Sequence, residues 1–496
     1  MENKPKVVLA ILDGFGIGEN NSKTNAIYAA NTPFFDQINN RYLQGQLFAS
    51  EEPVGIAKNQ FGNSELGHMT IGSGRTILGI NERFNSLIKS GNLSDFLLKQ
   101  EWVKQALNSS RPIHLCGLYS SGCVHANLEH FIALIDFFQK HNKKIALYLI
   151  SDGRDTPKYS FLSDLKNLLP KLKSTTKIIC VGGRYYGMDR DKNWERTQQY
   201  YSAMQQDEKF IINTNFVDYV DEQNNNGRDD EFISPACIQD EQYKICSGDE
   251  IVFLNYRADR IRQLIELFYN QGIKLIGLCE YPNVVIDEII MDKQPMNNIL
   301  GELLEQNNIK QLRVAETEKF AHVTFFFDAG KDVSKHKHQQ QILIDSKKVA
   351  TYDLSPEMSA KEITDTVVNN LASNDFIVVN YANSDMVGHT GNFEATKKAI
   401  EFLDKQCATL YNSVIDKFNG TLIITSDHGN ADLMIDENNQ IVKTHSVAKV
   451  PFYVLSNKYE LATSSGVLQD IAPSILYIYG INKPKDMDGS NLVKKK

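Results

Sequence analysis

Three short apolar segments, far apart in the chain, each lead into side chains that commonly bind metal ions. Residues 7–12 lead into Asp13, residues 377–379 lead toward Asp385 and His389, and residues 422–424 lead into Asp427 and His428. In an open α/β sheet, side chains that follow parallel strands converge at the carboxyl ends of those strands. Carboxylate oxygens suit hard divalent cations, and imidazole nitrogens suit borderline metals. The pattern predicts parallel strands that bring these side chains into one metal site, with enough ligands for two ions.

The spacing inside these segments favours the same interpretation. Asp385 and His389 lie on one face if a helix starts there, and His445 lies a short loop beyond Asp427 and His428. Each segment alone has an ordinary alternative, because an Asp after a strand often caps a helix and a single His is often structural. The recurrence at three strand ends favours the metal site.

Length and charge limit the class of protein. A chain of 496 residues is too long for one ordinary core, so two domains are expected. A net charge of −8 argues against binding to a nucleic-acid backbone by bulk attraction. The seven cysteines are scattered without a C-x-x-C pair, which argues for a reducing compartment. The first apolar run stops at Asp13 without a cleavage-site pattern, so we expect a cytoplasmic monomer with no membrane or nucleic-acid partner.

The middle of the chain has the pattern of a second α/β unit. Apolar strands are expected near residues 112–118, 145–150, 178–181 and 251–254, with amphipathic helices after the first and the last. The ends of these strands carry a different set of side chains: His125, Arg154, Asp155, Arg184, Arg190, Arg257 and Arg260. The planar arginine fork matches carboxylate and phosphate oxygens, so five arginines together predict a site for a small anion with two charged groups. The alternative is that they are surface charges paired with Asp152, Asp189 and Asp259.

The metal-type segments lie on both sides of the arginine-bearing segment in the sequence, so the second unit is expected to be inserted into the first. We expect a metal domain formed by residues 1–77 and 294–496 and an inserted substrate-binding domain formed by residues 78–293, because Gly, Pro and Asn residues interrupt the periodicity near both crossings. Two adjacent crossings would form a hinge, and closure around a substrate would exclude water.

Ser64 is the candidate nucleophile. It follows a Gly-containing loop and precedes a predicted helix, where backbone amides favour anions. A serine at this place can equally be an ordinary helix cap. A metal ion is one recognised means of activating a serine hydroxyl.

Taken together, these motifs closely resemble those of the cofactor-independent (2,3-bisphosphoglycerate-independent) phosphoglycerate mutases of the alkaline phosphatase superfamily. The resemblance covers essentially the whole chain. The segments that carry it are residues 12–16, 63–68, 152–156, 183–190, 255–260, 316–319, 352–359, 385–391 and 427–430. It implies an alkaline-phosphatase-like α/β metal domain with a second α/β domain inserted.

The resemblance also implies roles for individual residues. One metal ion would be bound by Asp13, Ser64, Asp427 and His428, and the other by Asp385, His389 and His445. The substrate would be bound by His125, Arg154, Asp155, Arg184, Arg190, Arg257, Arg260 and Lys319. Ser64 would be phosphorylated during turnover, Asp155 would be the base toward the glycerate hydroxyl, and Lys319 would support the phosphoryl group. The chain departs from the family at Ala126 and Asn127, where the family usually has Ser and His, and in the residues around His445.

The implied reaction is the interconversion of 3-phosphoglycerate and 2-phosphoglycerate without 2,3-bisphosphoglycerate. We expect two divalent ions, with Mn²⁺ first and Mg²⁺, Co²⁺ or Zn²⁺ as alternatives, because Asp, His and Ser ligands suit all four to different degrees. The alternatives are a phosphatase or sulfatase of the same superfamily, which would not need the arginine-bearing insertion, and a phosphopentomutase. A dinucleotide site at residues 14–18 is disfavoured, because position 19 is Glu and the G-x-G-x-x-G spacing fails.

Overall fold

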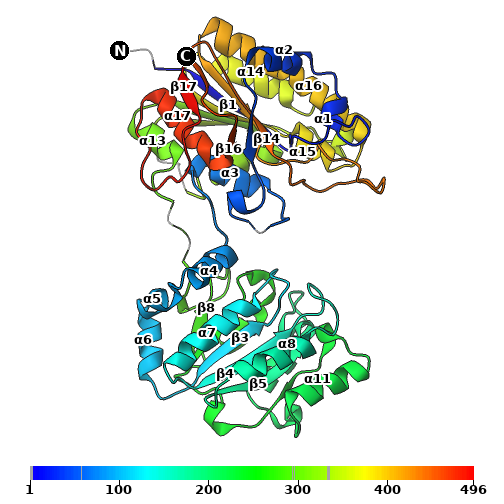
Figure 1. The fold of residues 1–496 in the computed structure, drawn as a ribbon, viewed down its shortest axis with the longest axis vertical. Helices are drawn as coiled ribbons and strands as arrows, with labels where there is room; N and C mark the ends of the chain where they lie inside the picture. Colours follow the sequence, from blue (N-terminus) through cyan, green and yellow to red (C-terminus); the bar gives the residue numbers. More distant parts are fainter. Residues whose placement is uncertain (1–3, 57, 293, 295, 332–335) are drawn as a thin grey trace. The chain divides into compact units, whose positions relative to one another are not determined.

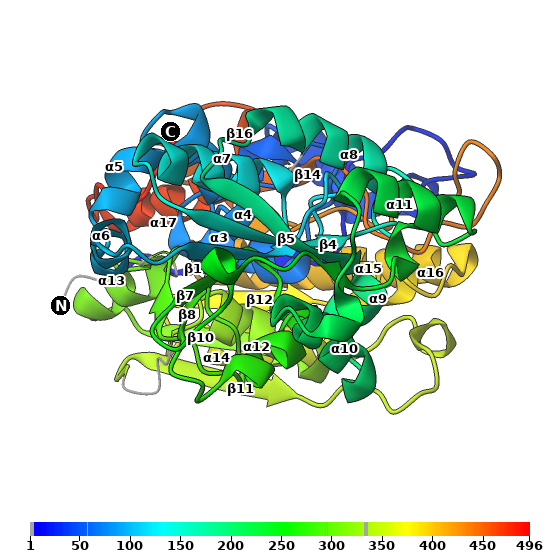
Figure 2. The same cartoon turned by 90° about the horizontal axis from the view of Figure 1, so that it is seen from below.

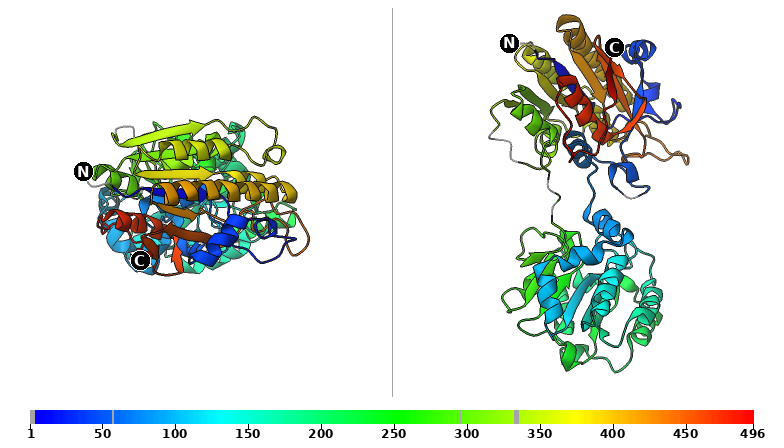
Figure 3. Two further views of the ribbon diagram at one scale, coloured as in Figure 1. Left: turned by 90° about the horizontal axis from the view of Figure 1, so that it is seen from above. Right: turned by 60° about the vertical axis from the view of Figure 1, so that its left-hand side comes forward.

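The computed structural model of the chain describes residues 4–56, 58–292, 294, 296–331 and 336–496. Its contacts divide the chain into two compact units. Unit 1 consists of Met1–Leu78 and Pro295–Lys496, and unit 2 consists of Gly79–Gln294. The chain therefore passes from one unit to the other twice (Figures 1 and 3).

Unit 1 is built on an eight-stranded sheet. In spatial order its strands are β11 (Gln339–Ile344), β10 (Gln311–Glu316), β12 (Phe376–Tyr381), β1 (Val7–Leu12), β13 (Thr421–Thr425), β14 (Val450–Ser456), β2 (Gly45–Phe48) and β16 (Ser465–Val467). The first five are mutually parallel. The three strands predicted from the metal-type segments are β12, β1 and β13, which are parallel neighbours. That part of the prediction is confirmed.

Helices cover both faces of this sheet, which is why β1 is apolar at every position. Val7, Leu9 and Ile11 of β1 belong to the core beneath α13 (Leu300–Gln306) and α17 (Ile471–Tyr479). The alternate residues of β1 belong to the core beneath α2 (Pro33–Arg41), α14 (Ala360–Asn370) and α16 (Phe393–Tyr411). Figure 1 shows these two groups of helices around the sheet. A continuous apolar run without alternation is typical of a parallel strand buried on both faces.

Unit 2 has a seven-stranded sheet of its own. In spatial order the strands are β6 (Ala236–Cys237), β5 (Thr176–Gly183), β4 (Ile145–Ser151), β3 (Ile113–Leu118), β7 (Glu250–Phe253), β8 (Lys274–Gly277) and β9 (Glu288–Ile289), and only β6 pairs in the antiparallel sense. The four predicted strands are β3, β4, β5 and β7, which lie side by side.

The helices of unit 2 also form two layers. One face of the sheet packs against α7 (Leu128–Lys140), α8 (Phe161–Leu168) and α11 (Phe216–Asn225), and the other packs against α10 (Trp194–Met204) and α12 (Arg262–Phe268). Figure 2 shows the sheet between these layers. Among the described residues, no helix combines the length and the apolar character that crossing a membrane requires.

Candidate metal centre and anion site

The metal-type side chains follow three adjacent strands of unit 1. Asp13 comes directly after β1, and Asp427 and His428 come after β13. Asp385 lies in the short helix α15 (Asn383–Gly388) after β12, His389 is the C-cap of that helix, and His445 lies in the loop before β14. Gly14 allows the close approach of these loops, since its φ is +74° and a Cβ there would lie 2.8 Å from Asp385 Cα. The strand order thus gathers side chains that are more than 350 residues apart.

One group of three ligand-type side chains surrounds Ser64. Asp13, Asp427 and His428 are fully buried, and their ligand atoms lie within 4.8 Å of one another. His428 Nε2 lies 3.3 Å from Asp13 Oδ1 and 3.6 Å from Asp427 Oδ2. Asp427 Oδ2 is buried and accepts no hydrogen bond from the described residues. This donor set fits a divalent cation.

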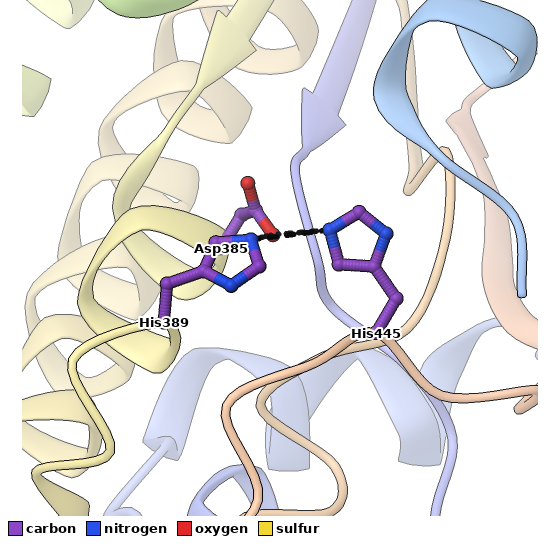
Figure 4. Close-up of side chains that lie close together, drawn as sticks. All are labelled: Asp385, His389 and His445. Atoms are coloured by element: carbon purple, nitrogen blue, oxygen red, sulfur yellow. Dashed lines mark hydrogen bonds and ion pairs between the residues drawn. The ribbon is translucent and has the colours of Figure 1, made fainter. Parts of the chain in front are cut away.

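A second group consists of Asp385, His389 and His445. Figure 4 shows both imidazoles turned toward the Asp385 carboxylate. His389 Nε2 lies 3.1 Å from Asp385 Oδ1, and His445 Nε2 lies 3.3 Å from the same oxygen. The two groups are in contact, because the His428 and His445 rings stack with centroids 3.8 Å apart.

Backbone carbonyls fix the orientation of both imidazoles in the second group. His389 Nδ1 lies 2.7 Å from Lys443 O, and His445 Nδ1 lies 2.8 Å from Gly62 O. A carbonyl oxygen only accepts, so each Nδ1 carries the proton and donates it. In their neutral form, the two imidazoles present the lone pairs of their Nε2 atoms, 3.1 Å apart, to the same point. Imidazoles held in this way by an outer hydrogen bond are typical of metal ligands.

Ser64 is the first residue of helix α3 (Ser64–Ser73), and it is not the cap. Asn63 caps the helix by accepting a hydrogen bond from the backbone N–H of Leu66. The Ser64 hydroxyl lies 2.9 Å from His428 Nε2 and 3.1 Å from Asp13 Oδ1, to which it donates. The alternative of an ordinary N-cap serine is therefore wrong.

Lys319 joins the two ligand groups. It lies in the 3₁₀ turn Thr317–Lys319 that follows β10, and its side chain is buried. Its Nζ donates to Asp13 Oδ1 at 2.8 Å, to Asp385 Oδ2 at 2.7 Å and to Ser64 Oγ at 2.8 Å. One ammonium thus contacts the serine and a carboxylate from each group.

The charges of this centre favour the binding of cations. Burial raises the pKa of Asp427, but His428, His68 and Lys319 outweigh it, and the net pKa is below the usual range. Burial lowers the pKa of His428, but Asp427 and the other carboxylates raise it to about 9. The pKa of Lys319 is raised for the same reason, against the effect of burial. The buried carboxylates Asp13, Asp385 and Asp427 therefore stabilise the charged forms of His428 and Lys319.

Three residues that support this centre were not predicted from the sequence. His68 Nδ1 lies 2.8 Å from Ser64 O and 3.2 Å from Asp427 Oδ2. Asn380, near the end of β12, donates to Asp13 Oδ2 at 2.8 Å, and Asn430 donates to Asp385 Oδ1 at 2.8 Å. His68 lies one helical turn after Ser64, so the i, i+4 spacing was an available signal.

In unit 2, four of the five predicted arginines line one cavity of about 340 Å³: Arg154, Arg184, Arg190 and Arg260. Burial lowers the pKa of Arg260, and repulsion from Arg184, Arg190 and Arg154 lowers it further. Like charges that crowd a cavity favour the binding of an anion.

Carboxylates organise the remaining residues of this cluster. Asp259 Oδ1 lies 3.4 Å from both His125 Nδ1 and Arg257 Nε, and Asp259 Oδ2 lies 3.3 Å from Arg190 Nη1. Arg184 Nη1 lies 2.6 Å from Asp152 Oδ1 and 2.6 Å from Asp155 Oδ2. The ion pairs proposed as the alternative interpretation are thus present, and they hold arginines at the cavity.

Asn127, where the resemblance would place a histidine, is the N-cap of α7. Its Oδ1 accepts from the backbone N–H of Glu129, and its Nδ2 donates to Asn81 Oδ1 at 3.1 Å. Asn81 belongs to helix α4 (Ile80–Lys89). The substitution therefore joins two helices of unit 2.

Comparison with known proteins gives concordant matches. Residues 5–483 match the family described as the Metalloenzyme superfamily. The chain is 42% identical to a 2,3-bisphosphoglycerate-independent phosphoglycerate mutase of Mycoplasma genitalium, over 99% of each chain. It is 40% identical to the enzyme of that name from Legionella pneumophila, over 100% of this chain and 99% of the relative.

A solved structure shares the fold. The Leishmania mexicana phosphoglycerate mutase, determined at low cobalt concentration, matches with a TM-score of 0.58 and 25% identity over 100% of this chain and 98% of that chain. The predicted fold class, an alkaline-phosphatase-like α/β unit with a second α/β unit inserted, is confirmed.

Proposed function

We propose a catalytic role for Ser64 in this chain, which belongs to the Metalloenzyme superfamily and to the 2,3-bisphosphoglycerate-independent phosphoglycerate mutases. The protein is an isomerase of glycolysis and gluconeogenesis that interconverts 3-phosphoglycerate and 2-phosphoglycerate, and it uses divalent metal ions. We infer that the phosphoryl group passes through a phosphoserine at Ser64.

The proposed first half of the reaction moves the phosphoryl group from substrate to Ser64. The Ser64 oxygen forms a bond to phosphorus as the bond to the glycerate oxygen breaks, and overall the proton of the Ser64 hydroxyl passes to the released glycerate oxygen. Lys319, 2.8 Å from Ser64 Oγ, is placed to stabilise the charge on the phosphoryl oxygens. In the second half the other glycerate hydroxyl attacks the phosphoserine and gives its proton to Asp155. The bond between phosphorus and the Ser64 oxygen breaks, and that oxygen takes up a proton.

The arginine cluster of unit 2 would hold the glycerate between the two transfers. His125, Arg154, Arg184, Arg190, Arg257 and Arg260 are the proposed contacts to its anionic groups, with Lys319 at the phosphoryl group. A well-oriented group can reach an effective molarity of roughly 10⁵ M or more. Held glycerate would therefore attack the phosphoserine faster than water does.

We propose two divalent ions, with Mn²⁺ as the first candidate. Asp13, Ser64, Asp427 and His428 would hold one, and Asp385, His389 and His445 the other. When bound, the ions would acidify the Ser64 hydroxyl and neutralise charge on the phosphoryl oxygens. We also propose that the enzyme acts as a monomer in the cytoplasm, with phosphoglycerate as its partner and no membrane or nucleic acid.

One observation carries the proposal for Ser64: its hydroxyl lies within 3.1 Å of Asp13, His428 and Lys319 together. Ser64→Ala should lose mutase activity by about 10⁴-fold or more, as expected for removal of a nucleophile. Mass spectrometry of acid-quenched wild-type enzyme should find phosphate on the peptide that contains Ser64.

Ser73 provides a matched control. It is a buried serine at the other end of α3, and its Oγ lies 3.5 Å from Thr70 O. Ser73→Ala should keep activity within about 2-fold of wild type, because single small side chains away from a site have modest effects. Substantial mutase activity in Ser64→Ala would assign the nucleophile to another residue.

A further inference from the structure

Asp152 is a buried carboxylate that accepts hydrogen bonds from three proposed substrate-binding residues and from Ser120. It comes directly after β4 and is 3% exposed. It accepts hydrogen bonds from Ser120 Oγ at 2.5 Å, from the backbone N–H of Arg154 at 3.1 Å and of Asp155 at 3.0 Å, and from Arg184 Nη1 at 2.6 Å. With both oxygens occupied and only 3% of the residue exposed, Asp152 is not placed to touch a substrate.

These bonds fix the loop that carries Arg154 and Asp155. Gly153 takes a φ of +72°, and a Cβ there would lie 2.6 Å from the backbone nitrogen of Glu231. The loop is therefore a tight turn, and the Asp152 carboxylate closes it by accepting from the backbone N–H groups of Arg154 and Asp155. The direction of the Arg154 and Asp155 side chains depends on that turn.

Asp152 also shares one arginine with Asp155. Arg184 Nη1 lies 2.6 Å from a carboxylate oxygen of each, and the Arg184 side chain is 2% exposed. The Asp155 side chain is 21% exposed, against 2% for Asp152. Without the charge of Asp152, Asp155 would be the one carboxylate among the described residues left to pair with this buried guanidinium. It would then be drawn toward Arg184 and away from a substrate hydroxyl.

We propose that Asp152 is a positioning residue that sets the geometry of Arg154, Asp155 and Arg184 for the glycerate part of the substrate. The inference rests on the proposed function of this cluster. Asp152 acts through the Arg184 guanidinium and the backbone of the loop, with Ser120 fixing the orientation of its carboxylate.

Asp152→Asn tests the proposal directly. The amide oxygen can still accept from the two backbone N–H groups, so the turn is kept while the negative charge that pairs with Arg184 is lost. Loss of this ion pair corresponds to a rise in the KM for 3-phosphoglycerate of about 10- to 100-fold. Ser120→Ala removes one of the four donors and should raise the KM by a smaller factor. In both variants, phosphoserine once formed should release more inorganic phosphate per 2-phosphoglycerate than in wild type.

Asp249 provides the matched control. It is also 3% exposed, it lies 3.0 Å from Arg111 Nη1 and 3.4 Å from His114 Nε2, and it accepts from Cys246 N at 2.7 Å. It precedes β7, whereas Asp152 follows β4, and the strands of this sheet from β3 to β5 and β7 are parallel. Asp249 therefore lies at the amino ends of these parallel strands, whereas Asp152 lies at their carboxyl ends. Asp249→Asn should lower the urea unfolding midpoint and leave the KM within about 2-fold of wild type.

The proposal is overturned if Asp152→Asn has wild-type KM and product ratio, or if Asp249→Asn raises the KM as much as Asp152→Asn does. If Asp152→Asn does not fold, Ser120→Ala decides: a raised KM supports the proposal and an unchanged one overturns it. Failure of the proposed function is a separate result, because wild-type enzyme would then form no phosphoserine at Ser64.

Discussion

Replacement of Lys319 by Met should affect the metal-free protein more than the metal-loaded protein. The Lys319 ammonium lies 2.8 Å from Asp13 Oδ1 and 2.7 Å from Asp385 Oδ2, and its side chain is 6% exposed. Methionine has a similar length and no charge. Removing one partner of a buried ion pair costs about 3–5 kcal/mol, because the remaining charge is left uncompensated. In the presence of EDTA we therefore expect the unfolding free energy of Lys319→Met to fall by about that amount.

Divalent ions should reverse much of this loss. They would be bound by the same carboxylates, and a ligand that binds only the folded state stabilises it in proportion to the logarithm of its concentration over Kd. With saturating Mn²⁺ the difference between Lys319→Met and wild type should shrink. Mutase activity of the metal-loaded variant should still fall by about 10²- to 10³-fold, the usual effect of removing one preorganised charge from a transition state.

Urea unfolding of wild type and variant, each in EDTA and in Mn²⁺, measures this effect. Lys143→Met is the control, since Lys143 is also buried but donates to the backbone carbonyls of Ala106 and Ser109. Its loss of stability should be the same with and without metal. Equal losses for Lys319→Met in the two conditions would refute the idea that Lys319 neutralises the metal-binding carboxylates.

Three further predictions concern the two sites and a buried histidine of unit 2. Treatment with EDTA should abolish mutase activity and added Mn²⁺ should restore it, whereas full activity in demetallated protein would end the metal proposal. Replacing both Arg257 and Arg260 by Ala should raise the ratio of inorganic phosphate to 2-phosphoglycerate formed from 3-phosphoglycerate, since poorly held glycerate competes less well with water. An unchanged ratio at a near-normal mutase rate would mean that the two arginines are solvated surface residues without a role in holding glycerate. Burial lowers the pKa of His130 from 6.5 to about 4, so the unfolded chain binds more protons between those values and stability falls as the pH falls through that window, by up to about 3 kcal/mol. His130→Gln should remove most of that fall in urea unfolding, and an unchanged pH profile would contradict the lowered pKa.

The sequence predicted that these acidic side chains converge because each follows its strand directly. Asp13, Asp385 and Asp427 come within a few residues of β1, β12 and β13, so the position of the strand fixes that of the side chain. The rule for carboxyl ends of parallel strands then brings them together without any knowledge of long-range packing.

The same rule could not define the roles of residues that act through distant contacts. Lys319 follows β10, yet its ammonium contacts Ser64, 255 positions away in the chain, and that contact depends on which strands are neighbours. The roles of Lys319 and Asp155 came only from the family resemblance. Asn380 was not predicted because a neutral amide within an apolar strand carries no signal of its own, although its contact with Asp13 is as short as that of Lys319.

The net charge of the chain bears on the binding of long polyanions and gives no information about small charged ligands. The chain carries a net charge of −8, which disfavours a long polyanion because such a ligand interacts with a large part of the surface. The charges are nevertheless segregated: unit 1 buries Asp13, Asp385 and Asp427 around one lysine, and unit 2 gathers four arginines at one cavity. Within a cavity, the nearby charges dominate because interactions between exposed charges are screened beyond about 10 Å at 0.1 M salt. Each centre therefore favours a small ligand of the opposite charge, and the sum over the whole chain conceals both preferences.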